Sequence, residues 1–480
     1  MNTHPPAPAV RALAMHILFS NPPWWEFGPD RQLRQGIRAG SRWPFTRPAV
    51  HAPDQFRFGG YLPFPFFLAH AAAHTRELLP AATVELRDSI ARGESYQKFF
   101  NHLAAKPPDW LVLETATAAW THDVTLIQLL ADSLPAMRII LAGPIDEARH
   151  AAILKAHPNV GAIVQGEFDK QIARVLTAAA ASDYRPQVFP HALLTQAELT
   201  ASPLPLWDDV AALNYFDACP PMRTGERAPQ LTLWASRGCP FKCIFCVWPA
   251  VMTGHDPDGT QTRKVRTYSP AYIERHLHAR LAAAAAAGQP YRSIYFDDDT
   301  FNLVERHTLA IAEVMRRIDL PWSAMCRADT LSREGWRTLR DSGCYGVKLG
   351  FESGSQHVID HIINKRLDLK AAAETAIWLR SELGLTVHGT FTIGLPGETP
   401  AQQRETEDFI AGLYAAGGLD SHQLSGTAEI EGTPLHTLGQ LGSLARYDGA
   451  KLDAGYLRGP DGQKKIEQLH QATLPASSHP

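Results

Sequence analysis

The segment Cys239-Pro-Phe-Lys-Cys243-Ile-Phe-Cys246 places three cysteines within eight residues, in the spacing C-x3-C-x2-C. Three thiolates this close together can bind three irons of a [4Fe–4S] cube and leave the fourth iron without a protein ligand. An iron with an open coordination position can bind and activate a small molecule. The spacing therefore predicts an iron–sulfur site at Cys239, Cys243 and Cys246.

Two other uses of these cysteines are less consistent with the sequence. A structural zinc site needs four ligands, and no further pair of cysteines or histidines follows at zinc-finger spacing. A disulfide framework is unusual in a long chain with only six cysteines. The other three, Cys219, Cys326 and Cys344, are scattered and are interpreted as ordinary buried thiols.

Length and composition exclude several classes of protein. The chain has 480 residues, enough for two or three domains of ~100–200 residues each. Its formal net charge of −3 gives no electrostatic reason to expect nucleic acid or an anionic membrane as a partner. No apolar run reaches the ~18–20 residues of a membrane span, and residues 10–20 lack the cleavage site of a signal peptide. We therefore expect a cytoplasmic protein without a membrane span.

The N-terminal part of the chain alternates between short apolar runs and helical patterns. Continuous apolar runs are typical of parallel strands that are buried on both faces, and the alternation predicts a doubly wound α/β domain. Such sheets bind ligands at the carboxyl ends of their strands. No G-x-G-x-x-G follows the first strand, so a dinucleotide site is unsupported. The predicted strands are 15–21, 83–87, 110–115, 138–142 and 162–165, with helices at 124–133 and 170–181.

A second alternation begins near residue 230, after a proline-rich linker at 201–207. Six strands, with a helix after each of the first five, predict a partial (β/α)6 barrel. Catalytic groups of such barrels lie at the carboxyl ends of the strands, and the cysteine segment follows the first strand at that end. The predicted strands are 231–236, 293–297, 322–327, 346–351, 387–393 and 422–426, with helices that include 270–287, 306–318 and 369–383.

Charged residues follow the next two strands of this barrel. Asp297-Asp298-Asp299 ends the second strand, and three adjacent buried acids would repel one another unless one faces a cation, a backbone donor or solvent. They could equally form an acidic turn that caps the following helix. Arg327 ends the third strand and could pair with a carboxylate of a ligand or with one of these acids.

Three motifs resemble the radical S-adenosylmethionine (SAM) enzymes: the cysteine segment with Phe245 before its last cysteine, Gly350-Phe351-Glu352-Ser353-Gly354, and the turn Gly394-Leu395-Pro396-Gly397-Glu398-Thr399. The resemblance implies that the open iron binds SAM and that a 5′-deoxyadenosyl radical is formed. The turn could also be a plain strand-to-helix connection. The resemblance implies SAM contacts at Phe245, Asp297, Asp299, Arg327, Glu352 and Ser353.

The N-terminal strand ends are similar to those of the cobalamin-binding domain in one radical SAM subfamily, as are residues 36–44 and Trp248-Pro249. The D-x-H-x-x-G motif that places a histidine on cobalt is absent. The resemblance therefore implies cobalamin without a histidine ligand, with Trp43, Tyr61 and Phe64 as candidates for the lower face. A degenerate domain without a corrin is the alternative. The implied cobalamin contacts are Asn21, Pro22, Thr115, Ala116, Thr117, Gly143, Pro144, Gly166 and Glu167.

The expected organisation is a Rossmann-like (flavodoxin-like) cobalamin-binding domain at 1–195, a linker at 196–228, a radical SAM domain at 229–430 and a short extension at 431–480. The resemblance favours a methyltransferase that uses SAM and methylcobalamin to methylate an unactivated carbon, or a phosphinate phosphorus, of a small molecule or peptide. An external one-electron reductant such as flavodoxin or ferredoxin would be its partner. A non-methylating radical reaction, polar methylation and a non-catalytic corrinoid protein are the alternatives.

Overall fold

The structure is a computed structural model that describes residues 15–27, 33–36, 62–115, 119–215, 227–427 and 432–440. The chain forms two compact units. The first contains the described parts of Met1–Gly59, Pro65–Leu193 and Ser202–Ala212, and the second those of Gly60–Phe64, Leu194–Ala201 and Leu213–Pro480. Several positions named above lie outside the described residues: Trp43, Tyr61, Ala116, Thr117, Cys219 and most of the extension at 431–480.

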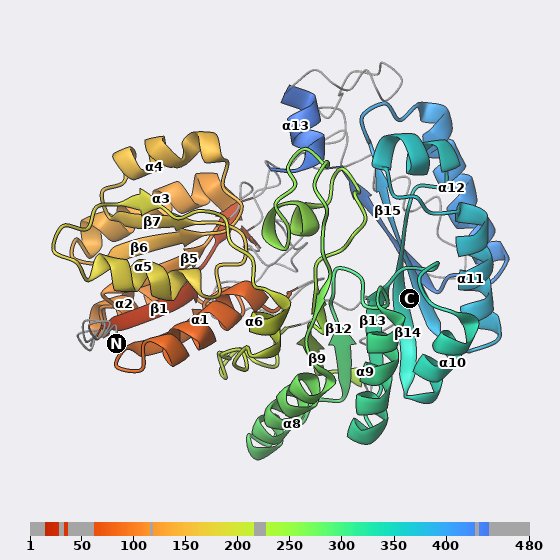
Figure 1. Ribbon diagram of the computed structural model, residues 1–480, viewed down its shortest axis with the longest axis horizontal. Coiled ribbons are helices and arrows are strands. Elements are labelled where there is room, and N and C mark those ends of the chain that lie inside the picture. Colours follow the sequence, from red (N-terminus) through yellow and green to blue (C-terminus); the bar gives the residue numbers. More distant parts are fainter. Residues whose placement is uncertain are drawn as a thin grey trace, which may run out of the picture. The chain divides into compact units, whose positions relative to one another are not determined.

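The first unit is built on a parallel sheet in the order β4-β1-β5-β6-β7-β8, with helices on both faces (Figure 1). The strands β5 and β7 are buried along their whole length, as parallel strands covered on both faces must be. The elements are β1 (His16–Asn21), α1 (Phe66–Leu78), β4 (Thr83–Asp88), α2 (Tyr96–Ala105), β5 (Trp110–Glu114), α3 (Trp120–Ser133), β6 (Arg138–Ala142), α4 (His150–Ala156), β7 (Val160–Val164), α5 (Gln171–Ala179) and β8 (Gln187–Val188), with a small antiparallel pair β2 (Trp25–Phe27) and β3 (Leu33–Gln35).

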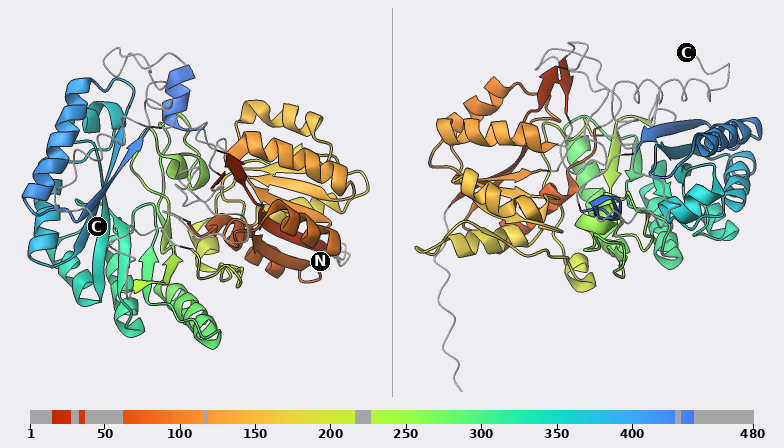
Figure 2. Two further views of the ribbon diagram at one scale, coloured as in Figure 1. Left: turned by 180° about the vertical axis from the view of Figure 1, so that it is seen from behind. Right: turned by 90° about the horizontal axis from the view of Figure 1, so that it is seen from above.

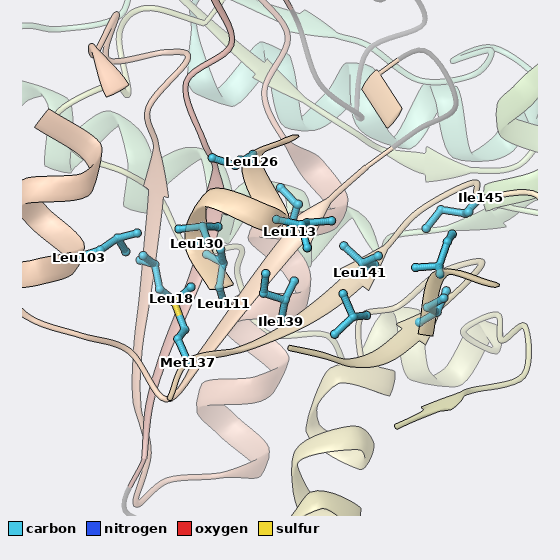
Figure 3. Packing of buried hydrophobic residues seen from close by; sticks show 14 of the residues in the cluster. Leu18, Leu103, Leu111, Leu113, Leu126, Leu130, Met137, Ile139, Leu141 and Ile145 are labelled. Atoms are coloured by element: carbon cyan, nitrogen blue, oxygen red, sulfur yellow. The ribbon is translucent and has the colours of Figure 1, made fainter. Parts of the chain in front are cut away.

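Side chains alternate between the two faces of the sheet along each strand, so this unit has two apolar layers, one on each face. Figure 3 shows Leu111 and Leu113 of β5 packed against Leu126 and Leu130 of α3. The helices α2 and α4 contribute further side chains to the same layer. The opposite face carries α1 and α5, where the rings of Phe67 and Phe168 lie 5.9 Å apart. Because side chains alternate along a strand, Glu114 of β5 lies on this second face.

The second unit is built on six parallel strands in the order β9-β12-β13-β14-β15-β16, and each of the first five is followed by a helix that packs on the outer side (Figures 1 and 2). The predicted α/β class with two parallel sheets is thereby confirmed. The elements are α6 (Gln196–Thr200), β9 (Gln230–Leu233), β10 (Ser236–Arg237), β11 (Arg266–Thr267), α8 (Pro270–Ala286), β12 (Ser293–Phe296), α9 (Glu305–Ile318), β13 (Trp322–Cys326), α10 (Arg333–Asp341), β14 (Cys344–Glu352), α11 (Leu369–Ser381), β15 (Thr386–Ile393), α12 (Pro400–Ala415), β16 (Ser421–Gly426) and α13 (Pro434–Gln440).

Local sequence explains where several of these helices begin. Ser269 caps α8 by accepting a hydrogen bond from the backbone N–H of Tyr272, and Pro270 occupies the first turn, where its missing N–H costs nothing. Thr399 and Gln402 form a reciprocal capping box at the start of α12.

Among the residues that the structure describes, none of the helices combines the length and the hydropathy that a membrane span requires.

Candidate active site

The cysteine segment lies in a loop that leaves the carboxyl end of β9. A short antiparallel ladder joins Ser236 to Thr267 and Arg237 to Arg266, and so closes residues 238–265 into one excursion from the sheet. Inside it, Arg263 forms a buried ion pair with Asp256 (2.6 Å) and donates a second hydrogen bond to the carbonyl of Phe241 (2.8 Å). The ladder and this ion pair fix the shape of the loop.

Gly238 sets the backbone path into the first cysteine. Its φ of +91° lies in the left-handed region, and a Cβ at this position would stand 2.3 Å from the carbonyl oxygen of Lys264. Its N–H donates to a carboxylate oxygen of Asp299 (3.1 Å). Only glycine fits this conformation without moving the backbone, so the position of Cys239 depends on it.

The three thiols of the motif are not joined in disulfides. Cys239 is buried, with its sulfur 3.9 Å from the hydroxyl of Thr300, whereas Cys243 and Cys246 are half-buried. Burial, together with the charges of Asp299 and Cys243, raises the pKa of the Cys239 thiol to about 11. Bound iron acts in the opposite direction, because a metal ion stabilises the thiolate that coordinates it.

The donor set fits an iron–sulfur cube. Three cysteines on one loop bind three different irons, so their thiols stand further apart than ligands that share a single ion. Cys239, Cys243 and Cys246 would hold the cluster, and their role stays a prediction.

The acids after β12 attach the cysteine loop to the sheet. Asp298 is fully buried and accepts hydrogen bonds from the backbone N–H of Ala235 (3.0 Å) and from the hydroxyl of Ser236. Asp299 accepts from Gly238 and from the hydroxyl of Thr253 (3.3 Å). Burial raises the pKa of Asp298 to about 7 despite these hydrogen bonds. Asp297 is also buried at this strand end, and SAM contacts at Asp297 and Asp299 stay predictions.

Arg327 pairs with a different acid from those suggested by the sequence. Its guanidinium makes a two-pronged ion pair with Asp329 (2.6 and 2.9 Å) and donates to the carbonyl of Arg366 (2.7 Å). The same guanidinium stacks on the ring of Phe241, 3.7 Å from its centroid. Arg327 therefore touches the cysteine loop through an aromatic ring. Its ion-pair partner is Asp329 and not one of the three acids that follow β12.

Glu352 and Ser353 lie at the carboxyl end of β14, as the motif predicted, but their side chains have different surroundings. Glu352 forms an ion pair with Lys365 (3.0 Å) and accepts from the hydroxyl of Thr392 (3.3 Å). The hydroxyl of Ser353 is fully buried and meets the hydroxyl of Thr406 on α12 (3.1 Å). Ser353 thus ties the sheet edge to a helix, and SAM contacts at Glu352 and Ser353 stay predictions.

A carboxylate within the turn after β15 accepts hydrogen bonds from the backbone of the same turn. Gly394 and Gly397 have φ of +74° and +84°, and the carboxylate of Glu398 accepts from the N–H groups of Gly394 (2.7 Å) and Leu395 (3.2 Å). Burial raises the pKa of Glu398 to about 7. These contacts give the turn a structural role, and a place for it near adenine stays a prediction.

In the first unit, several stretches attributed to cobalamin meet at the carboxyl edge of the sheet. The N–H of Thr115 donates to Ala142 (2.8 Å), and a Cβ on Gly143 would stand 2.1 Å from the carbonyl of Thr115. Gly166 has a φ of +72° and lies against the carbonyl of Ala192. Asn21, Pro22, Pro144 and Glu167 are buried at the same edge. Their contacts with a corrin stay predictions.

The predicted cobalamin contacts do not include Glu114, the last residue of β5. Its side chain is fully buried, and neither carboxyl oxygen has a hydrogen-bond partner among the residues that the structure describes. Burial, with a smaller contribution from Asp88, raises the pKa of Glu114 to about 8. The raised pKa favours the neutral acid, whose O–H can donate a hydrogen bond. An acid at the end of an otherwise apolar run was the available signal.

Comparison with known proteins identifies the second unit. Residues 235–410 match the family model described as the Radical SAM superfamily. The chain therefore carries a radical SAM domain, a class of enzyme domain that implies a [4Fe–4S] cluster and SAM. The class predicted from the cysteine segment is confirmed.

Several known proteins are similar to longer parts of the chain at low sequence identity. An uncharacterized methyltransferase of Pyrococcus horikoshii is 21% identical over 355 residues, 73% of each chain. The cytidylyl-2-hydroxyethylphosphonate methyltransferase of Streptomyces wedmorensis is 28% identical over 46% of this chain and 40% of its own length. The cobalamin-dependent radical enzyme OxsB, with aqua-cobalamin and SAM bound, has a similar fold (TM-score 0.64, 13% identity, 95% of this chain and 70% of that one). The methyltransferase TsrM from Kitasatospora setae, with cobalamin and a [4Fe–4S] cluster bound, gives a TM-score of 0.60 at 14% identity over 89% of this chain and 78% of that one.

Gly238→Ala tests the dependence of the cysteine loop on its glycine. The new methyl group meets the carbonyl of Lys264, so we expect the variant to lose about 1–3 kcal/mol of stability and most of its capacity to bind iron. The measurements are the thermal midpoint and the iron and sulfide content after reconstitution. Gly288→Ala is the matched control, because Gly288 also has a positive φ (+72°) but no atom within 4 Å of the added Cβ. Equal iron content in the two variants would contradict the prediction.

Glu114→Gln tests whether Glu114 is protonated in the folded protein, through the pH dependence of stability. The folded protein keeps the Glu114 proton up to about pH 8, whereas the unfolded chain loses it near the ordinary pKa of 4.5. Stability therefore falls as pH rises through this window, by up to about 5 kcal/mol. Glu114→Gln stays neutral, so its thermal midpoint should rise relative to the wild type between pH 5 and pH 9.

The control for this comparison is Glu147→Gln, which removes an exposed carboxylate from the same unit. A difference between Glu114→Gln and the wild type that is the same at pH 5 and at pH 9 would show that Glu114 is ionised in the folded protein.

Proposed function

We propose that the protein is a cobalamin-dependent radical SAM methyltransferase that acts on an unactivated carbon, or on a phosphinate phosphorus, of a small molecule or peptide. The observation that carries the proposal is the cysteine loop at the carboxyl end of β9, tied by Asp298 and Asp299 to the end of β12. The match of residues 235–410 to the radical SAM family supports it. Two matched relatives are named as methyltransferases.

Cobalamin is the second part of the proposal. The first unit offers a parallel sheet whose carboxyl edge combines glycines in close backbone contact with buried polar groups that lack partners among the described residues, such as Glu114 and the side-chain oxygen of Asn21. The strand order of its first five strands is that of flavodoxin-like doubly wound sheets, which bind ligands at this edge. OxsB and TsrM, whose folds are similar, have cobalamin bound.

When bound, these cofactors supply the electron that cleaves SAM, the radical and the methyl group. The chain itself binds and orients them. Asp298 and Asp299 fix the root of the cysteine loop, and Arg327 supports that loop through Phe241. Glu352 offers a carboxylate to the ribose or ammonium of SAM, and Glu114 offers a neutral acid to an acceptor on the corrin side chains.

The proposal is tested anaerobically on reconstituted protein with a one-electron reductant, SAM and methylcobalamin. We expect about one cobalamin per chain after gel filtration, together with 5′-deoxyadenosine and S-adenosylhomocysteine by mass spectrometry. Cys243→Ala should abolish the deoxyadenosine. Cys326→Ala is the control, because it removes a buried thiol of the same unit outside the motif.

The products separate the alternatives. Deoxyadenosine alone would favour a radical reaction without methyl transfer. S-adenosylhomocysteine alone would indicate polar methylation. Neither product from protein loaded with both cofactors would count against an enzyme and in favour of a non-catalytic corrinoid protein.

A further inference from the structure

A buried lysine lies beside the cysteine loop, at a position that no motif assigns. Lys365 follows the π-helical turn Val358–Ile363, and its backbone N–H donates to Ile359 (3.0 Å). The carbonyl of Ile363 accepts a hydrogen bond from the N–H of Ile244 (3.0 Å), the residue after Cys243. The lysine segment is therefore joined by its backbone to the cysteine segment.

The backbone around Lys365 is strained. Among the described residues, four that are not glycine have a positive φ: Asp319, Glu352, Asn364 and Arg366. Asp319 and Asn364 end helical segments, where this conformation is common. Glu352 (φ +68°) and Arg366 (φ +53°) have no such reason, and they are the ion-pair partner and the chain neighbour of Lys365. Strain of this kind persists where the surrounding structure enforces it, which is often at functional sites.

The ion pair of Lys365 with Glu352 is packed against glycine. A Cβ on Gly350 would stand 2.5 Å from the carboxylate of Glu352 and 2.9 Å from the ammonium of Lys365. The two side chains are only 10% and 14% exposed. Because the desolvation of two charges offsets much of their attraction, a buried pair is weak as a source of stability. Stability alone therefore does not account for this pair.

The charges of the pair act in opposite senses on the cysteine loop. The segment 363–366 meets the cysteine loop on both sides of Cys243: Ile363 accepts from Ile244, and Arg366 accepts from Arg327 (2.7 Å), which stacks on Phe241. On this side of the iron–sulfur site, the ammonium of Lys365 favours added negative charge and the carboxylate of Glu352 opposes it. Among the described residues, Glu352 is the hydrogen-bond partner of the Lys365 ammonium.

We propose that the ammonium of Lys365, held by Glu352 in the segment that meets the cysteine loop, favours the reduced cluster, whereas the carboxylate of Glu352 opposes it. The step concerned is the transfer of one electron from an external reductant to the cluster, and no bond forms or breaks in it. The inference rests on the proposed function to the extent that a cluster must be bound at the three cysteines.

The test is a redox titration of the reconstituted protein with dithionite and mediators, followed by the electron paramagnetic resonance signal of the reduced cluster. In Lys365→Met we expect an equilibrium constant for reduction about tenfold below that of the wild type, which is about 59 mV for a one-electron couple. Glu352→Gln should shift it about tenfold in the opposite direction. Lys365→Arg keeps the charge and should stay near the wild type.

The matched control is Lys370→Met, which removes an exposed ammonium from α11 of the same unit. Opposite shifts in Lys365→Met and Glu352→Gln cannot arise from a general loosening of the site, which would move both variants the same way. Should Lys365→Met fail to fold, the shift in Glu352→Gln decides alone. Shifts of the same sign, or none, with a cluster present overturn the inference. A wild-type protein that binds no iron overturns the proposed function as well.

Discussion

Two neighbouring carboxylates at the carboxyl end of β12 hold the root of the cysteine loop, and the candidate active site depends on this attachment. Asp298 accepts from Ala235 and Ser236, and Asp299 accepts from Gly238, the residue before Cys239. The position of the first thiol is therefore set by a strand adjacent in the sheet. Asp298 is buried at this point, and the raised pKa shows that the protein tolerates an electrostatic cost to keep it there.

The parallel sheets were largely predictable because parallel strands bury both faces and so leave continuous apolar runs in the sequence. The predicted strand at 138–142 coincides with β6. The sequence pattern predicts a strand that starts at 162, whereas β7 starts two residues earlier, at Val160. Gly161 explains this error: glycine is unfavourable in strands, but here it lies under the ring of Trp110, which a side chain would displace. This contact with Trp110 of another strand outweighs the low strand preference of glycine. It cannot be predicted from the sequence around Gly161 alone.

The sequence predicts the position of a site residue where a motif contains that residue. It predicts less well which other residue the side chain contacts in the folded protein. The sequence suggests a ligand carboxylate or one of the acids at 297–299 as the partner of Arg327, whereas its ion-pair partner is Asp329 and its ring contact is Phe241. Lys365 belongs to no motif, and Glu114 is not among the predicted contacts. Both became candidates through burial and through the presence or lack of a partner, which are properties of the folded chain.

The central claim is that the three cysteines hold a cluster whose open iron binds SAM. Its most direct test is the electron paramagnetic resonance spectrum of the reduced, anaerobically reconstituted protein, recorded before and after addition of SAM. The account predicts a [4Fe–4S] signal that changes shape when SAM binds. A loaded cluster whose spectrum is the same with and without SAM would contradict it.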